Sequence, residues 1–554
     1  MIQAKTESYS IMSRKYYINV NGKYGKSKYY KTGIDSLEAY IKEMDRLGIW
    51  GSVVTSPVND NSTISNDTML SDIERIPGAK ERIIPGFIIT PQITISPKEL
   101  SHLKECVNAA GPSCVVAMPK TSVFRLREIE RVLDYIGNKN LIMLIDIFEM
   151  NPATDTDDLI MLSEKYPEMK FVIRQVMWDT FGRAYDILLK TKNTYIDISW
   201  LHTRDAINIL IDSIGSSRIL FGTGRKSNNG ASVAALEYAC ISEEDKDKIA
   251  YKNFIELFAN ADDRQLLNSN LKEIKPQVTN SFWEDFMKGE GFKAAPIIDV
   301  HTHMGGSEPG YYVAENDMSR QFEDMKRDMD ALGIKTIVTS HISCGDSIEG
   351  NLELEACAQK FMGKEPSIWP FKGYVTYDPN NWEDYTEEYI ADVFSRNYFI
   401  GFKSLPHYMN VEIDDERYIP MFEYAKKYDK PVLLHTWGNC LGSPAACAKM
   451  HEKYSEVKLI LAHTGGEDIG RRECEEIAQN PQHKNIYFEF CGSFCSDISW
   501  EESLKRIDYR RVLFGSDAHL HSQAFELGRL LSLDIPDEWI RAILYDNAKS
   551  VLEI

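Results

Sequence analysis

Two histidines near the middle of the chain, His301 and His303, have the spacing of a metal-binding pair. They end residues 296–303, PIIDVHTH, which begin with the apolar run of a buried strand. Side chains at positions i and i+2 of a strand point to the same side, so both imidazoles can reach one ion. Imidazole nitrogen is a common ligand of Zn²⁺ and related cations. A polar strand end without a metal is the alternative for this pair taken alone.

Three further apolar runs in the second half end in a residue that can bind a metal. The runs and the residues after them are 432–434 with His435, 459–462 with His463, and 512–516 with Asp517. Continuous apolar runs of this length are typical of strands buried on both faces of a parallel sheet. Stretches with helical character separate them. Alternating strands and helices with polar groups at the strand ends predict a (β/α)₈ barrel whose site lies at the carboxyl ends of the strands.

The first half of the chain repeats the second with small insertions and deletions. INVNGK at 18–23 aligns with IDVHTH at 298–303, and RILFGTG at 218–224 aligns with RVLFGSD at 511–517. At 554 residues the chain is long enough for two barrels, because one barrel takes about 250 residues. We therefore predict two tandem (β/α)₈ TIM barrels, with domains at 1–278 and 279–554.

The first copy lacks the metal-binding side chains of the second. Asn21 and Lys23 align with His301 and His303, Gln175 lies near His463, Gly224 aligns with Asp517, and His435 falls near Ile145 or Asp146. A lysine amine at a ligand position disfavours a dication. We interpret the first barrel as a degenerate copy without metal ligands and place the metal site in the second barrel.

The order of these groups, His-x-His, His, His and Asp at the ends of successive strands, resembles the amidohydrolase superfamily. It is most similar to the amidohydrolase-related branch, which contains metal-dependent hydrolases and decarboxylases. The supporting motifs are GFKSLP at 401–406, KPVLLHT at 430–436, HTGG at 463–466, LFGSD at 513–517 and NAKSVL at 547–552. The resemblance covers about residues 295–554, and the repeat suggests a tandem duplication with a degenerate first copy.

The resemblance implies a single-metal site with the ligands His301, His303, His435 and Asp517. One Zn²⁺ is the expected ion, with other divalent metals as alternatives. A water in an open coordination position would have a lowered pKa. Asp517 would also accept a proton from this water. His463 would act as general acid or base, because imidazole titrates near neutral pH.

Lys403, at the end of the predicted fourth strand, leaves two roles open. Some members of the superfamily carry a carboxylated lysine here that bridges two metals, whereas single-metal relatives use this lysine for substrate or structure. Further candidates for the pocket wall are His341, His407, His519, His521 and Trp437. For these loop residues, packing without substrate contact is the alternative.

Two reactions fit such a site. The first is hydrolysis of a small ester, lactone or amide by a zinc-activated water. The alternative is non-oxidative decarboxylation of a small aromatic or unsaturated carboxylic acid, and CO₂ release without water incorporation would distinguish it. A third hypothesis, a binding module without catalysis, predicts protein free of metal.

The composition of the chain limits the classes of binding partner that we expect. A net charge of −20 argues against nucleic acid, and no long uncharged apolar run predicts a membrane span. The ten cysteines are scattered singly, and no secretory signal opens the chain, so we expect reduced thiols and a cytoplasmic location. The expected partner is a small-molecule substrate. We also expect the first barrel to act as an intramolecular, pseudo-dimer partner of the second, with homo-oligomers as a further possibility.

Overall fold

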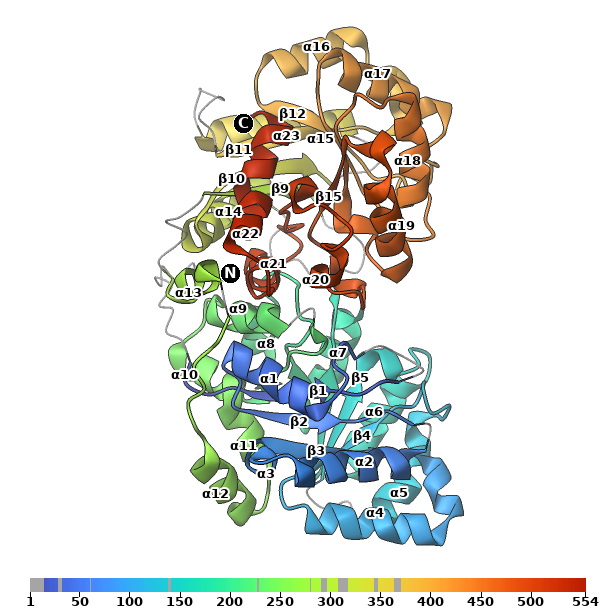
Figure 1. Cartoon of the computed structure of the whole chain (residues 1–554), viewed down its shortest axis with the longest axis vertical. Coiled ribbons are helices and arrows are strands. Elements are labelled where there is room, and N and C mark those ends of the chain that lie inside the picture. Colours follow the sequence, from blue (N-terminus) through green and yellow to red (C-terminus); the bar gives the residue numbers. More distant parts are fainter. Residues whose placement is uncertain are drawn as a thin grey trace. The chain divides into compact units, whose positions relative to one another are not determined.

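The chain forms two compact units, the first ending at Val278 and the second following it. The computed structural model describes residues 14–27, 32–59, 61–137, 141–226, 229–278, 280–289, 296–306, 317–342, 347–362 and 370–554. Each unit contains one sheet of eight parallel strands with helices between them (Figure 1). Both are (β/α)₈ TIM barrels, which confirms the predicted fold class.

In the first barrel the strands follow one another in chain order around the sheet. They are β1 (Ile18–Lys23), β2 (Gly51–Thr55), β3 (Ile83–Ile89), β4 (Cys114–Ala117), β5 (Ile142–Asp146), β6 (Lys170–Arg174), β7 (Thr194–Asp197) and β8 (Ile219–Leu220). The amide of Val20 donates to the carbonyl oxygen of Phe221 at 3.0 Å. This bond joins the first strand to the end of the last one and closes the sheet into a barrel.

Several helices of the first barrel are amphipathic, with buried apolar side chains on one face. Helix α1, for example, starts at the cap Ser36, ends at Gly48 with a φ of 75°, and buries Leu37, Tyr40 and Met44. The helices are α1 (Leu37–Leu47), α2 (Ser62–Arg75), α3 (Ala79–Arg82), α4 (Pro97–Ala109), α5 (Glu130–Ile136), α6 (Asp155–Lys165), α7 (Trp178–Lys190), α8 (Ala206–Ile214), α9 (Asn229–Glu237), α10 (Glu243–Asp247), α11 (Asn253–Leu257) and α12 (Ala261–Asn270).

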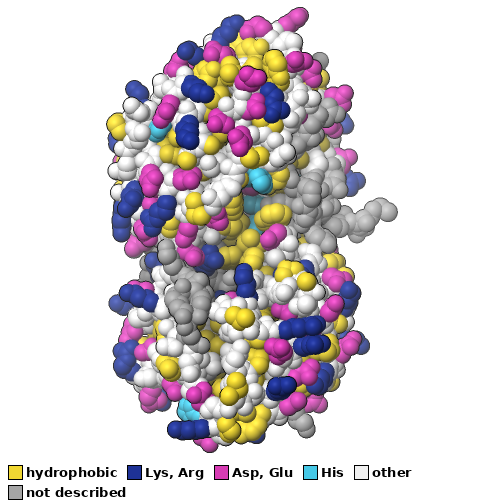
Figure 2. Space-filling model, turned by 90° about the vertical axis from the view of Figure 1, so that its right-hand side faces the viewer, with side chains coloured by type: hydrophobic (Ala, Val, Ile, Leu, Met, Phe, Trp, Pro, Cys, Tyr) yellow, Lys and Arg dark blue, Asp and Glu magenta, His cyan; other side chains and the backbone are white. Residues whose placement is uncertain are grey.

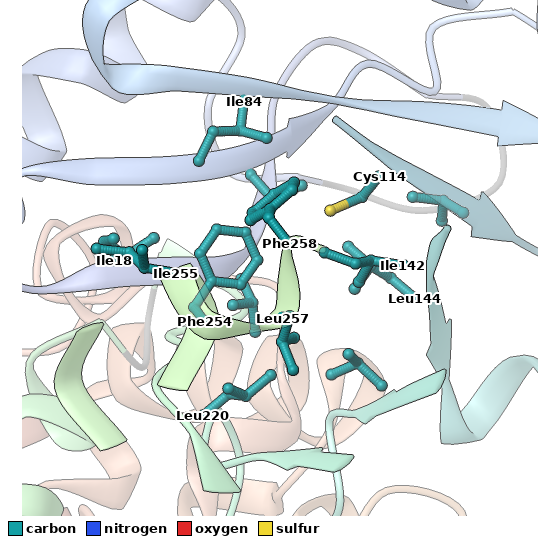
Figure 3. Close-up of a cluster of buried hydrophobic side chains, with 14 of the residues drawn as sticks. Ile18, Ile84, Cys114, Ile142, Leu144, Leu220, Phe254, Ile255, Leu257 and Phe258 are labelled. Atoms are coloured by element: carbon teal, nitrogen blue, oxygen red, sulfur yellow. The ribbon is translucent and has the colours of Figure 1, made fainter. Parts of the chain in front are cut away.

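Aliphatic side chains of the strands and the rings after β8 form a core in the first barrel (Figure 3). Ile18, Leu144 and Leu220 are completely buried, and Phe254 and Phe258 pack among them. Burial of a side chain of this size contributes about 1.5–3 kcal/mol to folding. The interior of the barrel is therefore a packed core rather than a channel, and polar groups are left for the strand ends.

The second barrel has the same strand order and the same closure. The amide of Val300 donates to the carbonyl oxygen of Phe514 at 3.0 Å. Its strands are β9 (Ile297–Met304), β10 (Ile334–His341), β11 (Phe371–Thr376), β12 (Phe399–Ser404), β13 (Val432–Leu434), β14 (Leu459–Leu461), β15 (Ile486–Glu489) and β16 (Val512–Leu513). Its helices are α13 (Ser281–Met287), α14 (Met318–Leu332), α15 (Ser347–Met362), α16 (Glu387–Ser395), α17 (Ile419–Lys427), α18 (Pro444–Lys453), α19 (Asp468–Gln479), α20 (Trp500–Ser503), α21 (Gln523–Leu531), α22 (Asp537–Arg541) and α23 (Asn547–Leu552).

The closing segments of the two barrels share an unusual hydrogen-bond pattern. A single-turn π-helix, Lys248–Lys252 in one barrel and Ala542–Asp546 in the other, precedes α11 and α23. The side-chain amide of Asn253 donates to two carbonyl oxygens around β8, at 2.7 and 2.8 Å. Asn547 makes the same pair of bonds around β16, both at 2.8 Å. The repeat seen in the sequence is thus accompanied by two barrels with matching details, consistent with a tandem duplication.

The surface carries charges of both signs. Lys and Arg side chains alternate with Asp and Glu on the visible face, without a large patch of either sign (Figure 2). The nine cysteines in the described part of the chain are all free thiols. Among the described residues, no helix is long and apolar enough to cross a bilayer.

Candidate metal centre

Three of the four predicted ligands converge at the carboxyl ends of the strands of the second barrel. His301 and His303 end β9, and Asp517 follows β16, its neighbour across the barrel closure. Nε2 of His301 lies 3.1 Å from Nε2 of His303, and Oδ1 of Asp517 lies 3.6 and 3.3 Å from these two atoms. Bonds of about 2.0–2.2 Å to a tetrahedral metal put ligand atoms about 3.3–3.5 Å apart, so the three donor atoms fit one ion.

The second nitrogen of each imidazole already has a partner. Nδ1 of His301 lies 3.1 Å from Oε2 of Glu489, and Nδ1 of His303 lies 2.9 Å from the Ser340 hydroxyl. When these oxygens accept the Nδ1 protons, both Nε2 atoms carry lone pairs. Two lone pairs 3.1 Å apart repel each other unless a cation lies near them, and this cation can be the ammonium group of Lys403, 2.7 Å from Nε2 of His301, or a bound metal ion. This donor arrangement therefore fits a divalent metal.

The imidazoles are held in the neutral form that binds metals. Burial lowers the pKa of His301 well below its ordinary value, and nearby Lys403 lowers it further. Burial also lowers the pKa of His303. Burial alone would raise the pKa of Asp517, but the surrounding histidines, foremost His521 and His301, hold it well below its ordinary value. A carboxylate beside neutral imidazoles is a common ligand set for zinc and manganese.

His435 and His463 form a hydrogen-bonded pair beside this cluster. Nδ1 of His463 donates to the carbonyl oxygen of Cys491 at 3.3 Å, which leaves its Nε2 as an acceptor. Nδ1 of His435 lies 3.0 Å from that Nε2 and donates to it. His435 therefore keeps a lone pair on its own Nε2, as a metal ligand requires. Burial lowers the pKa of His463 to about 4, so this residue is a base in the free site.

The backbone at the site is strained at positions that carry chemistry. His463, Thr464 and Asp517 have φ angles of 62°, 45° and 60°, in the left-handed region that non-glycine residues rarely adopt. Such residues cost about 1–3 kcal/mol each and persist where their surroundings fix them. The amide of His463 donates to Glu489 at 2.9 Å, and the amide of Asp517 donates to the carbonyl oxygen of His301 at 2.8 Å. These bonds hold the left-handed residues in place.

Glu489, at the end of β15, is a site residue that the sequence analysis did not single out. Its carboxylate is completely buried and accepts the amides of His463 and Cys491 at 2.9 and 2.6 Å, besides facing His301. Burial raises its pKa to about 8. The signal was present, because residues 486–488 are a short, mostly apolar run that ends in a polar residue like the other strands. Glu489 orients His301 from behind, as carboxylates do in many metal sites.

Lys403 ends β12 in the middle of the histidines. Its side chain is completely buried, and Nζ donates to Nε2 of His301 at 2.7 Å. A lysine in this position is close enough to contact either a metal-bound group or a substrate carboxylate. Both roles considered from the sequence remain compatible with this geometry.

Of the remaining candidates for the pocket wall, two lie beside histidines of the site and two have other neighbours. Trp437 lies with its ring 6.1 Å from that of His463, and the buried His519 donates its amide to the carbonyl oxygen of His303 at 3.2 Å. His341 instead packs between two glycines with Nε2 3.7 Å from Glu353, and His407 is exposed beside Tyr408.

Two further contacts involve the predicted ligands His435 and Asp517. The ring of Tyr408 lies 5.0 Å from that of His435, which the sequence analysis missed. His521 has Nδ1 3.8 Å from Oδ2 of Asp517.

Comparison with known proteins supplies one family match. Residues 298–554 match the family model described as amidohydrolase. No protein of the curated set matches the chain.

Solved structures that match include three decarboxylases. 5-Carboxyvanillate decarboxylase from Sphingomonas paucimobilis is 14% identical, with a TM-score of 0.37, and the match covers 47% of this chain and 100% of that one. Dihydroxybenzoic acid decarboxylase from Polaromonas sp. JS666, solved with manganese, is 17% identical, with a TM-score of 0.36. The match covers 47% of this chain and 97% of that one. 2,6-Dihydroxybenzoate decarboxylase from Rhizobium is 14% identical, with a TM-score of 0.34. The match covers 45% of this chain and 99% of that one.

Proposed function

We propose that the second barrel, of which residues 298–554 belong to the amidohydrolase family, is a metal-dependent decarboxylase. The proposed substrate is a small aromatic or unsaturated carboxylic acid that carries a hydroxyl group beside the carboxylate. Hydrolysis of an ester, lactone or amide, which the sequence analysis places first, is the second candidate.

The buried ammonium group of Lys403 is the observation that carries this proposal. It lies among the imidazoles of the site and 2.7 Å from His301. A lysine ammonium group beside a metal site can form a charge-assisted hydrogen bond with the carboxylate of a substrate. The same contact orients the carboxylate before it leaves as CO₂.

The residues that would hold the metal are His301, His303, His435 and Asp517. A divalent ion bound there would supply a Lewis acid that stabilises negative charge on substrate oxygens. Zinc remains the ion we expect from the histidine-rich donor set, with manganese as the alternative.

His463 is placed to carry the proton. Because its Nδ1 donates to a backbone carbonyl and its pKa is about 4, the neutral imidazole can take the hydroxyl proton of the substrate at Nε2, in place of the hydrogen bond from Nδ1 of His435. It then delivers that proton to the carbon from which CO₂ departs. The C–C bond breaks, its electron pair stays on the carbon that receives the proton, and the product leaves as the anion of the hydroxyl compound. No external proton or oxidant is needed.

Burial of the reacting groups also favours decarboxylation. His301, His303 and His463 are at most 5% exposed. A carboxylate that loses its hydration loses a stabilisation that the neutral product CO₂ does not need. Hydrolysis, by contrast, consumes a water molecule at this buried position.

Hydrolysis keeps one supporting observation. The ionised Asp517 lies within 3.3–3.6 Å of the two histidines of β9, where a carboxylate can accept a proton from a water molecule. This geometry is the reason to screen both reactions.

The test is an isotope experiment on the metal-loaded full chain. Hydroxybenzoates and unsaturated hydroxy acids are incubated in D₂O, and esters and lactones in H₂¹⁸O, with product analysis by mass spectrometry. Decarboxylation gives CO₂ and one deuterium on the product carbon without ¹⁸O in the product. One ¹⁸O in an acid product, with no CO₂, would instead establish hydrolysis and refute the proposal.

We further propose that the first barrel serves the second as an intramolecular partner. Residues 279–554 produced alone should then be less active or less stable than the full chain. A truncated protein with full activity and unchanged stability would contradict this role.

A further inference from the structure

We propose that the outside of the first barrel carries a separate Zn²⁺ site formed by Asp67, His102 and Cys106. The three residues lie on α2 and α4 and belong to the copy that lacks the ligands of the second barrel. This site is independent of the proposed reaction.

Helix geometry brings two of the ligands together. His102 and Cys106 are four residues apart on α4, so their side chains leave the same face one turn from each other. Helix α4 begins at the cap Ser96 with Pro97 in its first turn and spans 13 residues, which makes it a firm support. Asp67 faces this pair from the neighbouring α2.

One of the distances between donor atoms already matches a tetrahedral ion, and the other is somewhat shorter. Nε2 of His102 lies 3.7 Å from Sγ of Cys106 and 2.8 Å from Oδ1 of Asp67. All three donor atoms lie within 4.8 Å of one another. Zinc bonds of about 2.3 Å to sulfur and about 2.1 Å to nitrogen or oxygen place these atoms about 3.6 and 3.4 Å apart. The sulfur is already at the required distance, and the carboxylate needs to move by about half an ångström.

The chemistry of the set favours zinc. Thiolate, imidazole and carboxylate together suit a borderline cation, and three protein ligands leave one position for water. His102 and Asp67 are about half exposed, so an ion can enter directly from solvent and the side chains can adjust. Burial, together with Asp67 and Glu105, raises the pKa of the Cys106 thiol. Metal binding must release this proton, and the affinity is therefore expected to increase with pH.

Cobalt(II) is the probe for the test, because a Co²⁺–thiolate bond absorbs in the near ultraviolet and imidazole or carboxylate ligands do not. The full-length His301→Ala/His303→Ala variant is titrated first, so that the second barrel does not contribute. We expect one equivalent of Co²⁺ with the thiolate band, and displacement of the band by Zn²⁺. Cys106→Ser should abolish the band, and His102→Ala should weaken binding by about 100-fold, at the upper end of losses seen for supporting residues of metal sites.

Cys240→Ser, which removes another thiol of the same barrel, is the matched control and should keep the band. All substituted ligands are on the surface, so the variants should remain folded, and circular dichroism checks this. Absence of a thiolate band in the parent variant, or its persistence in Cys106→Ser, would overturn the proposal. A titration of wild type gives a second check, because the band should appear there with the same Cys106 dependence.

Discussion

The two barrels share a scaffold and differ in the few side chains that face the strand ends. In the first barrel, the side chain of Asn19 bonds the amide and hydroxyl of Thr223 at 3.0 and 2.8 Å. In the second, Asp299 accepts the amide of Ser516 at 3.0 Å and its hydroxyl at 2.5 Å. The same link between first and last strand is thus made by an amide in one copy and a carboxyl group in the other.

A second match lies at strand seven. Asp197 accepts the amide of Gln175 at 3.1 Å, and Glu489 accepts the amide of His463 at 2.9 Å. Gln175 and His463 both have left-handed backbones, with φ angles of 59° and 62°. The strained turn therefore persists in the first barrel even though its side chain is an amide rather than an imidazole. Strain at this place belongs to the shared scaffold as much as to the chemistry.

Strand register shows what stands at the position of His435. The residue before His435 pairs with Leu461, and Ile145 pairs with Ile173. Leu461 and Ile173 each precede the left-handed residue by two positions. Asp146, rather than Ile145, therefore corresponds to His435, which resolves the alternative left open by the sequence.

An ion-pair cluster fills the strand ends of the first barrel. Asp146 forms an ion pair with Lys23, and Nε of Arg174 donates to its Oδ1 at 2.8 Å. Arg174 is 1% exposed and aligns with the much smaller Ala462, which is completely buried in the core of the second barrel. The comparison shows that the same barrel scaffold carries a cluster of candidate metal ligands in one copy and an ion-pair cluster in the other.

The sharpest test of the contrast removes the strand-one pair from each barrel. His301→Ala/His303→Ala should lose the metal of the second barrel and reduce kcat/KM by about 1000-fold, because a metal contributes several kcal/mol to catalysis. Asn21→Ala/Lys23→Ala should keep both the metal of the second barrel and the activity. Metal content by plasma mass spectrometry and activity are measured on the same samples. Equal losses in the two variants would contradict the assignment of this metal centre to the strand ends of the second barrel.

The salt bridge of the first barrel can be broken by Asp146→Asn. This change leaves the buried Lys23 and Arg174 without their carboxylate and should lower the free energy of unfolding by about 3 kcal/mol. Denaturant unfolding followed by tryptophan fluorescence measures it. Glu38→Gln, which breaks an exposed pair with Arg75, is the control and should have no measurable effect. An unchanged midpoint for Asp146→Asn would show that the cluster does not stabilise this barrel.

Substitution of the strand-seven carboxyl groups, Glu489 and Asp197, should affect metal binding differently in the two barrels. Glu489→Gln replaces the carboxyl group behind His301 with an amide and should weaken metal binding by up to about 100-fold, as the loss of supporting carboxylates does elsewhere. Asp197→Asn, the corresponding change in the first barrel, should leave metal affinity unchanged. Competition with a chromophoric chelator gives both dissociation constants. If Glu489→Gln lowers only stability and not affinity, the residue does not position the ligand.

The smallest expected effect is a pH dependence of the first barrel. Burial raises the pKa of Asp197 to about 6, above its ordinary value of about 3.9. A raised carboxyl pKa contributes stability that is present below about pH 4 and is lost as the pH rises through 6. Burial alone would raise the pKa of Asp146, but Arg174 and Lys23 hold it below its ordinary value, so it titrates below this window.

Thermal unfolding between about pH 4 and pH 7 measures this dependence, and Asp197→Asn should flatten it. A profile that keeps its slope in the variant would assign the dependence to other groups.

Much of this protein follows from its sequence. The apolar runs specify strands buried on both faces, and their alternation with amphipathic helices specifies a barrel. The repeated motifs specify two barrels. The strand-end positions of His301, His303, His463 and Asp517 were sufficient to predict a common site, because the carboxyl ends of parallel strands meet at one end of a barrel.

Which of these side chains contact one another was decided by the tertiary structure alone. Glu489 is 188 positions from His301, and Asp146 is 123 from Lys23. Such pairs meet only when the sheet closes and the strand register is fixed, and neither closure nor register can be read from periodicity. The sequence thus determined which groups lie at the strand ends. The closed barrel decided which of them touch, and hence that one copy has a cluster of metal-binding groups and the other a salt bridge.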